Sequence, residues 1–224
     1  MFSGNFSKYL KFCFGMRILI LANGTEPSSG LLGSLRAKCN CFIAADGGGN
    51  TAIQMGFMPD IVIGDMDSFS HADDYTGELI CDPDQETNDL EKALKLARSR
   101  NADRVDVLGA TGKRLDHTLK NLSVMLQFQP RFDLLAFYDN QFYSRILPRD
   151  FSLTLPPGHT VSLFPLSGKV DGIITDGLRY PLRDESLENG RRDGSSNETL
   201  HGKIRIRHRS GALLFMTELT DQLI

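Results

Sequence analysis

The chain of 224 residues carries 25 lysines and arginines, 28 aspartates and glutamates, and a formal net charge of −3. This length fits one large domain or two modest ones, and the slightly acidic balance argues against nucleic-acid or anionic-membrane binding over the whole surface. The four cysteines form no CxxC pair and have no partner histidines at zinc spacing, so we predict reduced thiols in a cytoplasmic protein.

The N-terminal segment allows two interpretations. Lys8 and Lys11 precede the apolar run "FCFGMRILILA", which is the order of a signal peptide. Arg17 interrupts that run, and this favours a short extension at residues 1–15 followed by a buried strand at residues 16–22. No segment reaches the roughly 18 uninterrupted apolar residues of a membrane helix, so we predict no membrane span.

Short apolar runs alternate with helical patterns through the first two-thirds of the chain. The predicted helix "NDLEKALKLARSR" places Leu90, Ala93, Leu94 and Ala97 on one face, and "DHTLKNLSVMLQF" places Leu119, Leu122 and Leu126 on one face. This alternation predicts an α/β fold with a doubly wound, mostly parallel sheet and helices on both sides. The predicted strands are "RILILA", "FIAAD", "IVIGD", "RVDVLG" and "FDLLAFYD".

The texture changes after about residue 140, where short alternating runs, turn glycines and prolines replace the helical period. We therefore predict an α/β domain at residues 16–146 and a small antiparallel β domain at residues 147–224. The polar segment 184–199, "DESLENGRRDGSSNET", is expected to be a long surface loop.

Three suspicious loops follow predicted strands: "AADGGGN", "GDMDS" and "GATGKRLDH". Carboxyl ends of parallel strands border the ligand crevice, so the agreement in position indicates one site. In the first loop, Asp46 with Gly47 and Gly48 predicts a turn that approaches a phosphate or sugar and opens a helix at Asn50. A plain glycine turn is the alternative.

Asp65 and Asp67 follow the β-branched run "IVIG" directly. Such a run is typical of a buried strand, so the two carboxylates should lie just past its end, where they suit Mg²⁺. Alternatively, Asp67 caps the next turn and Asp65 is solvated. A third acid, Asp89, opens a predicted helix, and there it is either a metal ligand or a helix-dipole partner in a capping box.

The loop "GATGKRLDH" combines two cations with an acid and a histidine. Lys113 and Arg114 suit a polyphosphate, because arginine offers bidentate contacts and lysine a point charge. His117 is either a general base or a hydrogen-bonding group at a helix start. The later run "KIRIRHR" has the alternation of a half-exposed strand, which we prefer to a nucleic-acid contact.

Taken in order, "LANG", "ADGGGN", "IGDMDS", "DQETNDLEKAL", "GATGKRLDHTLKN", "SLFPLSG", "DGLRYPL" and "GSSNE" resemble the thiamin pyrophosphokinase family. The resemblance implies an α/β domain followed by a β-sandwich, and transfer of the pyrophosphoryl group of ATP to the hydroxyl of thiamin, with AMP as the second product. It implies a homodimer whose active sites take residues from both subunits. The site residues it implies are Asp65, Asp67 and Asp89 for Mg²⁺, Gln85, Ser196 and Asn197 for thiamin, and Asp116 near the reacting hydroxyl.

The chain departs from the family pattern at Asn88, where the usual residue is threonine, and it contains no tryptophan that could stack on thiamin. Two other functions compete with this interpretation. The sequence "DMDS" could belong to an aspartyl-phosphate phosphatase with Asp65 as the nucleophile, although that motif usually follows the first strand. A non-catalytic nucleotide or thiamin sensor is the other alternative.

Overall fold

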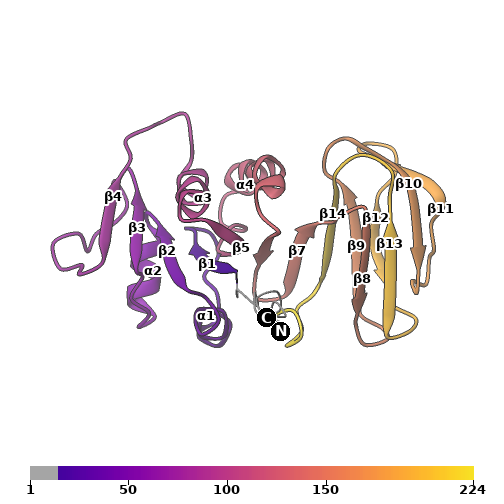
Figure 1. The fold of residues 1–224 in the computed structure, drawn as a ribbon, viewed down its shortest axis with the longest axis horizontal. Coiled ribbons are helices and arrows are strands. Elements are labelled where there is room, and N and C mark those ends of the chain that lie inside the picture. Colours follow the sequence, from indigo (N-terminus) through magenta and orange to yellow (C-terminus); the bar gives the residue numbers. More distant parts are fainter. Residues whose placement is uncertain (1–14) are drawn as a thin grey trace, which may run out of the picture.

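The computed structural model of the chain describes residues 15–224 (Figure 1). The predicted extension at residues 1–15 therefore lies outside the described residues, apart from Gly15. The α-helices are α1 (Ser29–Arg36), α2 (Gly48–Gln54), α3 (Asp89–Ser99) and α4 (Leu115–Phe128), and a 3-10 turn spans Gln129–Arg131. The strands are β1 (Met16–Leu21), β2 (Cys41–Ala45), β3 (Ile61–Gly64), β4 (Glu78–Cys81), β5 (Ala102–Leu108), β6 (Leu134–Tyr138), β7 (Phe142–Ile146), β8 (Asp150–Thr154), β9 (Thr160–Pro165), β10 (Lys169–Asp176), β11 (Arg183–Glu188), β12 (Gly194–Glu198), β13 (Lys203–Arg207) and β14 (Leu213–Glu218).

Ten strands form one sheet in the order β12-β9-β14-β7-β6-β5-β1-β2-β3-β4. Neighbours from β6 to β4 pair in parallel, whereas neighbours from β6 to β12 pair antiparallel. The chain adds β2 and β3 on one side of β1 and then places β5 and β6 on the other. Such a reversal opens a crevice beyond the carboxyl ends of β1 and β5.

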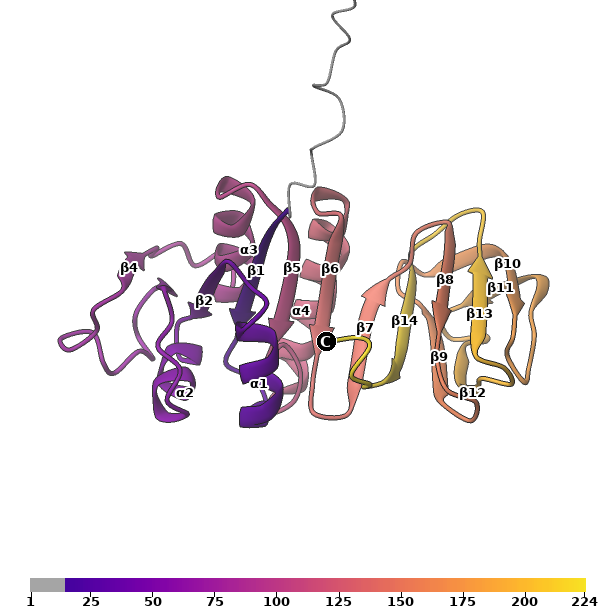
Figure 2. The same cartoon turned by 60° about the horizontal axis from the view of Figure 1, so that its bottom comes forward.

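Helices cover both faces of the parallel half, which confirms the predicted doubly wound arrangement (Figure 2). Side chains of a strand alternate between faces, so Leu19 packs with α1 and α2, whereas Ile18 packs with α3 and α4. The side chains of Leu32 on α1 and Leu94 on α3 are fully buried. The site loops therefore rise from strands that are fixed on both faces.

A second, four-stranded sheet has the order β11-β10-β13-β8 and is antiparallel throughout. Its buried side chains belong to the same apolar cluster as α1 and the antiparallel strands of the main sheet, so the two sheets pack as a sandwich. This confirms the predicted β-sandwich. The main sheet itself crosses the expected division at residue 146, because β14, β9 and β12 extend it beyond β7.

Several details differ from the sequence prediction. The segment 184–199 is not one loop, because β11 and β12 occupy most of it. Helix α2 begins at Gly48 rather than Asn50, and α1 and β4 were not predicted. Leu119 is exposed, and the buried face of α4 consists instead of Asn121, Val124, Met125 and Phe128. No helix among residues 15–224 is long and apolar enough to span a membrane.

Candidate active site

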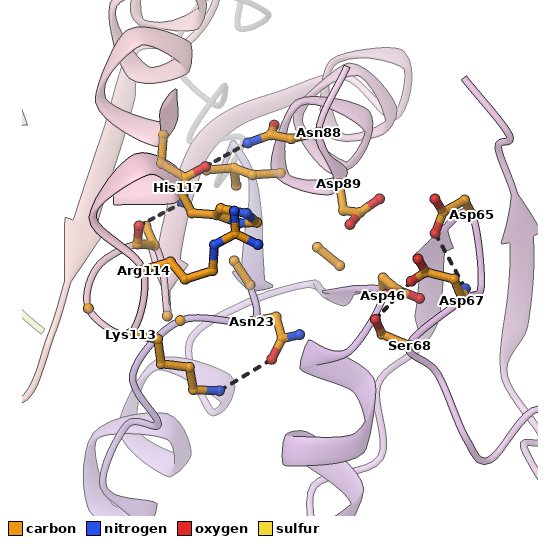
Figure 3. Close-up of a pocket in the computed structure, with 18 residues that line it drawn as sticks. Asn23, Asp46, Asp65, Asp67, Ser68, Asn88, Asp89, Lys113, Arg114 and His117 are labelled. Carbon is orange, nitrogen blue, oxygen red and sulfur yellow. Dashed lines mark hydrogen bonds between the residues drawn. The ribbon is translucent and has the colours of Figure 1, made fainter. Parts of the chain in front are cut away.

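A cavity of about 480 Å³ opens at the carboxyl ends of β1, β2, β3 and β5, beside the first turns of α3 and α4. Figure 3 shows its two walls: Asp46, Asp65, Asp67 and Asp89 lie on one side, and Lys113, Arg114 and His117 lie on the other. All three predicted loops thus meet at one site. The crevice at the reversal of strand order is therefore polar and carries opposite charges on opposite walls.

Asp46, Asp65 and Asp67 each offer a carboxylate oxygen within 4.8 Å of the others. Asp46 directly follows β2 and is only 3% exposed, and its buried Oδ1 has no hydrogen-bond partner. A buried carboxylate oxygen without a partner is costly unless a ligand completes it. Oxygen donors of this kind fit Mg²⁺. The sequence predicted a nucleotide contact for Asp46, and the structure places its carboxylate beside those of the predicted metal ligands Asp65 and Asp67.

Asp89 lines the same cavity at the first turn of α3, where its carboxylate pairs with the Lys92 ammonium at 3.3 Å. The Lys92 side chain is almost fully buried. Burial raises the pKa of Asp89, Lys92 opposes that rise, and the charges of Asp65 and Asp67 add to it. Asp89 is therefore a fourth carboxylate at the edge of the acidic group, balanced in part by an internal cation.

The pKa of Asp46 is also raised, first by burial and then by the negative charge of Asp89. By contrast, the pKa of Asp65 is lowered, chiefly because the Gln85 amide donates to its Oδ2 at 3.1 Å. Gln85 thus lies beside the acidic group. The resemblance to the family implies that Gln85 contacts thiamin. The carboxylates together form a site of concentrated negative charge, which a divalent cation would relieve.

The loop that carries Asp65 and Asp67 is fixed by side-chain contacts. Asn50 donates from Nδ2 to the Ser68 carbonyl at 2.6 Å and accepts from the Ser70 backbone at 3.0 Å. The Ser68 hydroxyl donates to Asp67 at 2.8 Å. Asn50 was predicted to bind nucleotide, but it does not line the cavity and instead braces the carboxylate loop.

The backbone is strained where these loops turn. Asp46, Met66 and Lys113 have positive φ angles of 43°, 66° and 53°. Residues other than glycine rarely adopt positive φ angles, and residues held in this region concentrate at functional sites. The turns therefore keep conformations that the surrounding packing must enforce.

Gly47 and Gly48 were predicted to approach a nucleotide, but neither lines the cavity. A Cβ atom on Gly48 would lie 2.2 Å from the Leu21 carbonyl oxygen, and one on Gly47 would lie 2.3 Å from Asn23 Nδ2. These glycines are needed because α2 begins directly against the end of β1. Without side chains at these positions, the backbone can turn directly after Asp46, whose side chain lines the cavity.

The opposite wall comes from the loop between β5 and α4. Lys113 Nζ donates to Asn23 Oδ1 at 3.3 Å, and the exposed Arg114 pairs with Asp116 at 2.5 Å. The Arg114 hydrogen bond lowers the pKa of Asp116 to about 2. Asp116 is fully exposed and does not line the cavity, whereas His117 does.

The predicted thiamin contacts Ser196 and Asn197 lie on β12, at the far edge of the main sheet. Asn197 is buried, and its amide accepts from the Tyr180 N–H at 3.0 Å and donates to the Tyr180 carbonyl at 2.7 Å. Tyr180 itself is 64% exposed. The structure thus brings Gln85 to the acidic group but keeps Ser196 and Asn197 away from it.

Sequence reasoning missed four residues of this region. Asn23, Ser68 and Asn121 line the cavity, and Lys92 lies buried beside Asp89. Asn23, Ser68 and Asn121 stand in the motifs "LANG", "IGDMDS" and "RLDHTLKN", where polar residues at strand ends or on a helix face gave a usable signal. Nothing in the sequence distinguishes Lys92 from Lys95, the other lysine of its helix.

Comparisons with known proteins agree with this geometry. Residues 32–135 match the family described as "Thiamin pyrophosphokinase, catalytic domain", and residues 147–213 match "Thiamin pyrophosphokinase, vitamin B1 binding domain". The chain is 27% identical to Thiamin pyrophosphokinase 1 of Caenorhabditis elegans, over 91% of this chain and 90% of that protein. It is 24% identical to the thiamine pyrophosphokinase of Bacillus subtilis, over 80% and 87% of the two chains.

Solved structures share the fold. The thiamin pyrophosphokinase from Candida albicans superposes with a TM-score of 0.79 at 20% identity, covering 92% of this chain and 90% of that one. The enzyme structure from Bacillus subtilis gives a TM-score of 0.77 at 22% identity, covering 92% and 99%. Because the two family matches together span most of the sequence, the chain belongs to the thiamin pyrophosphokinase family.

Proposed function

We propose that the cavity is the active site in which this chain transfers the pyrophosphoryl group of ATP to the hydroxyl of thiamin, giving thiamin diphosphate and AMP. The family fixes the reaction. The observation that supports the location is the pairing of a buried carboxylate group with a cationic loop across one cavity. Transfer of a phosphoryl group to an alcohol needs positioning and charge neutralisation more than covalent chemistry, and both kinds of group are present.

Asp46, Asp65 and Asp67 would hold Mg²⁺, and Asp89, which lines the same cavity, is the further ligand that the resemblance implies. The partnerless Oδ1 of Asp46 is the best support for this assignment. A bound magnesium ion supplies positive charge to the non-bridging oxygens of the phosphates. Lys92 keeps Asp89 in place and limits the repulsion between the carboxylates.

Lys113 and Arg114 would bind the phosphate chain from the opposite wall. Arginine can grip two phosphate oxygens at once, and lysine adds a mobile point charge. Asp116 holds Arg114 in place and, by the resemblance, lies near the thiamin hydroxyl. A carboxylate with a pKa of about 2 is a weak base, so we propose that Asp116 orients the hydroxyl rather than removing its proton.

The complete site takes residues from two subunits of a homodimer. Gln85 follows β4 beside β3, and Ser196 lies on β12. Eight strand spacings of about 4.8 Å separate β3 from β12, or about 38 Å along the sheet. One thiamin molecule cannot bridge that distance, and we therefore propose that a second subunit brings its β12 to this cavity.

Exposed apolar side chains support this pairing. Leu115 and Leu119, one turn apart on α4, are 72% and 59% exposed beside the cavity. Tyr180 and Leu200 are exposed beside β12. We propose that these two patches meet across the dimer interface, with Ser196 and Tyr180 facing thiamin and Asn197 holding Tyr180 in place.

We also propose a cytoplasmic location. Cys39, Cys41 and Cys81 are free, and together they are all the cysteines that the described residues contain. Free thiols are usual in reducing compartments.

The test is an assay of AMP formation from ATP, with thiamin and Mg²⁺ each present or omitted. We expect AMP and thiamin diphosphate in equal amounts only when both are present. Phosphate release without thiamin, together with a phosphoenzyme trapped after quench, would support the phosphatase alternative instead. Tight binding of ATP or thiamin without any AMP would support the sensor.

A further inference from the structure

Two hydrogen-bonded asparagine side chains connect the acidic wall of the cavity to the cationic loop. Asn121 on α4 is 7% exposed, and its Nδ2 donates to the Ala110 carbonyl at 2.7 Å. Its Oδ1 accepts from Asn88 Nδ2 at 2.8 Å (Figure 3). Asn88 Oδ1 in turn accepts from the Glu91 backbone at 2.9 Å, which caps α3. We call this chain of hydrogen bonds, Ala110–Asn121–Asn88, the amide bridge.

The amide bridge ends at two functional segments. Asn88 is the N-cap of α3, and the next residue is Asp89 of the acidic wall. Ala110 lies in the loop that continues to Lys113 and Arg114 of the cationic wall. The bridge therefore connects the helix that presents a carboxylate to the loop that presents the phosphate-binding cations.

Both segments adopt conformations that contacts with other parts of the molecule must stabilise. The cationic loop contains positive φ angles at Gly109, Gly112 and Lys113, and Lys113 lacks the freedom of glycine. The carboxylate of Asp89 lies among like charges that push it away. An amide offers a donor and an acceptor at once, so Asn88 can cap the helix and donate to Asn121 at the same time.

We propose that Asn121 and Asn88 are positioning residues for pyrophosphoryl transfer, and that they fix the separation between the acidic wall and the cationic wall. This inference rests on the proposed function. Outer groups that orient ligand-bearing residues typically change metal affinity or activity about 10- to 100-fold when they are removed. A residue that only supports the fold would change stability without changing either.

The test compares Asn121→Ala with Thr217→Ala in the full-length protein. Thr217 on β14 is also buried, and its hydroxyl donates to the Thr160 carbonyl at 2.8 Å, far from the cavity. Asn88→Ser is the third variant, because serine keeps a good helix cap but is too short to replace the bond to Asn121. Mn²⁺ affinity is measured by electron paramagnetic resonance without nucleotide, and kcat and KM by AMP formation.

We expect Asn121→Ala to weaken Mn²⁺ binding and to lower kcat, each about tenfold or more, with little change in KM for thiamin. Asn88→Ser should change both in the same direction, and the double variant should cost no more than Asn121→Ala, since both remove one bridge. Thr217→Ala should lower the melting temperature but leave Mn²⁺ affinity and kcat at the wild-type values.

Wild-type Mn²⁺ affinity and kcat in Asn88→Ser, or in a folded Asn121→Ala, would overturn the inference and leave the bridge a support of the fold alone. If Asn121→Ala does not fold, Asn88→Ser decides the question. Failure of the proposed function would look different, because the wild-type protein would then form no AMP. The Mn²⁺ titration would still test the bridge in that case.

Discussion

The two ends of the main sheet treat their buried polar groups differently. At the parallel end, Asp46 has a buried oxygen without a partner, and burial raises the pKa values of Asp46 and Asp89. At the antiparallel end, the Asn197 amide is bonded through both its oxygen and its nitrogen, and the Thr217 hydroxyl donates to a backbone carbonyl. The polar groups of Asn197 and Thr217 are thus satisfied within the fold. The Asp46 oxygen is not, and it belongs to a carboxylate that lines the cavity of the proposed metal site.

The largest effect that this comparison predicts comes from Asp65, which is half-buried, and Asp67, which is exposed. Asp65→Asn and Asp67→Asn should each lower turnover about 100-fold or more, because each removes charge that holds the metal. The fold should survive, since neither carboxylate supports packing. AMP formation and circular dichroism measure the two properties.

Asp150→Asn is the matched control. Asp150 pairs with Arg205 on the exposed face of the second sheet, and such surface pairs contribute little. Near-normal Mg²⁺-dependent activity in a folded Asp65→Asn or Asp67→Asn would remove these residues from the site.

The second prediction joins the two ends of the sheet across subunits. A mixture of Asp65→Asn and Asn197→Ala subunits should recover roughly a quarter of wild-type activity, provided that subunits exchange randomly and each parent is inactive. In the mixed dimer, one site carries both defects and the other carries none. If mass spectrometry confirms mixed dimers but no activity returns, each site is built within one chain.

The third prediction ranks the neighbours Asp116 and His117. Asp116→Ala should lower kcat more than His117→Ala, because loss of Asp116 also frees the Arg114 guanidinium that it holds at 2.5 Å. Misplaced groups can cost about 100-fold in rate, and we expect Asp116→Ala to approach that loss. Equal losses of kcat in the two folded variants would reverse this interpretation and give His117, which lines the cavity, the larger role.

A stability measurement sharpens the comparison further. Asp46→Asn should raise the melting temperature of the metal-free protein, because it removes a negative charge that burial and the neighbouring Asp89 both disfavour. Asparagine tolerates the positive φ at this position, so the backbone should not resist the change. Mg²⁺ should stabilise the wild type and not the variant. A lower melting temperature of metal-free Asp46→Asn would mean that folding itself needs the carboxylate.

How far the sequence could predict this molecule also differs between the two ends. Continuous apolar runs revealed β1, β2, β3, β5 and β6, and the "GDMDS" spacing revealed the carboxylates. The polar strands β11 and β12 were taken for a loop, because edge strands of a small sandwich alternate weakly and carry many charges. Local composition could not separate them from surface turns.

Sequence spacing indicates which kinds of group the site contains, but it says nothing about which carboxylate oxygens converge. The sequence context of Asp46 indicates only a turn near a nucleotide, whereas in the structure its carboxylate lies beside those of Asp65 and Asp67. On α4, a leucine stripe suggested the buried face, but the helix turns Leu119 outward and buries Asn121 toward the cavity. A polar residue that lines the cavity thus interrupts the apolar face of the helix, and patterns alone cannot locate an exception of this kind.

The smallest predicted effect concerns His208, which follows β13 of the second sheet and is buried with no partner for its Nε2. Burial lowers the pKa of His208, and the nearby Arg149 guanidinium, 2.9 Å from Nδ1, lowers it further. The unfolded chain therefore binds a proton more readily than the folded one, so stability should fall as pH drops below the ordinary histidine pKa of about 6.5. Between neutral and mildly acidic pH, the melting temperature of His208→Gln should fall less than that of the wild type. Thr217→Ala, which removes a buried hydrogen bond but no titrating group, should keep the wild-type difference. An unchanged pH dependence in His208→Gln would show that the imidazole is protonated as easily in the folded protein as in the unfolded chain.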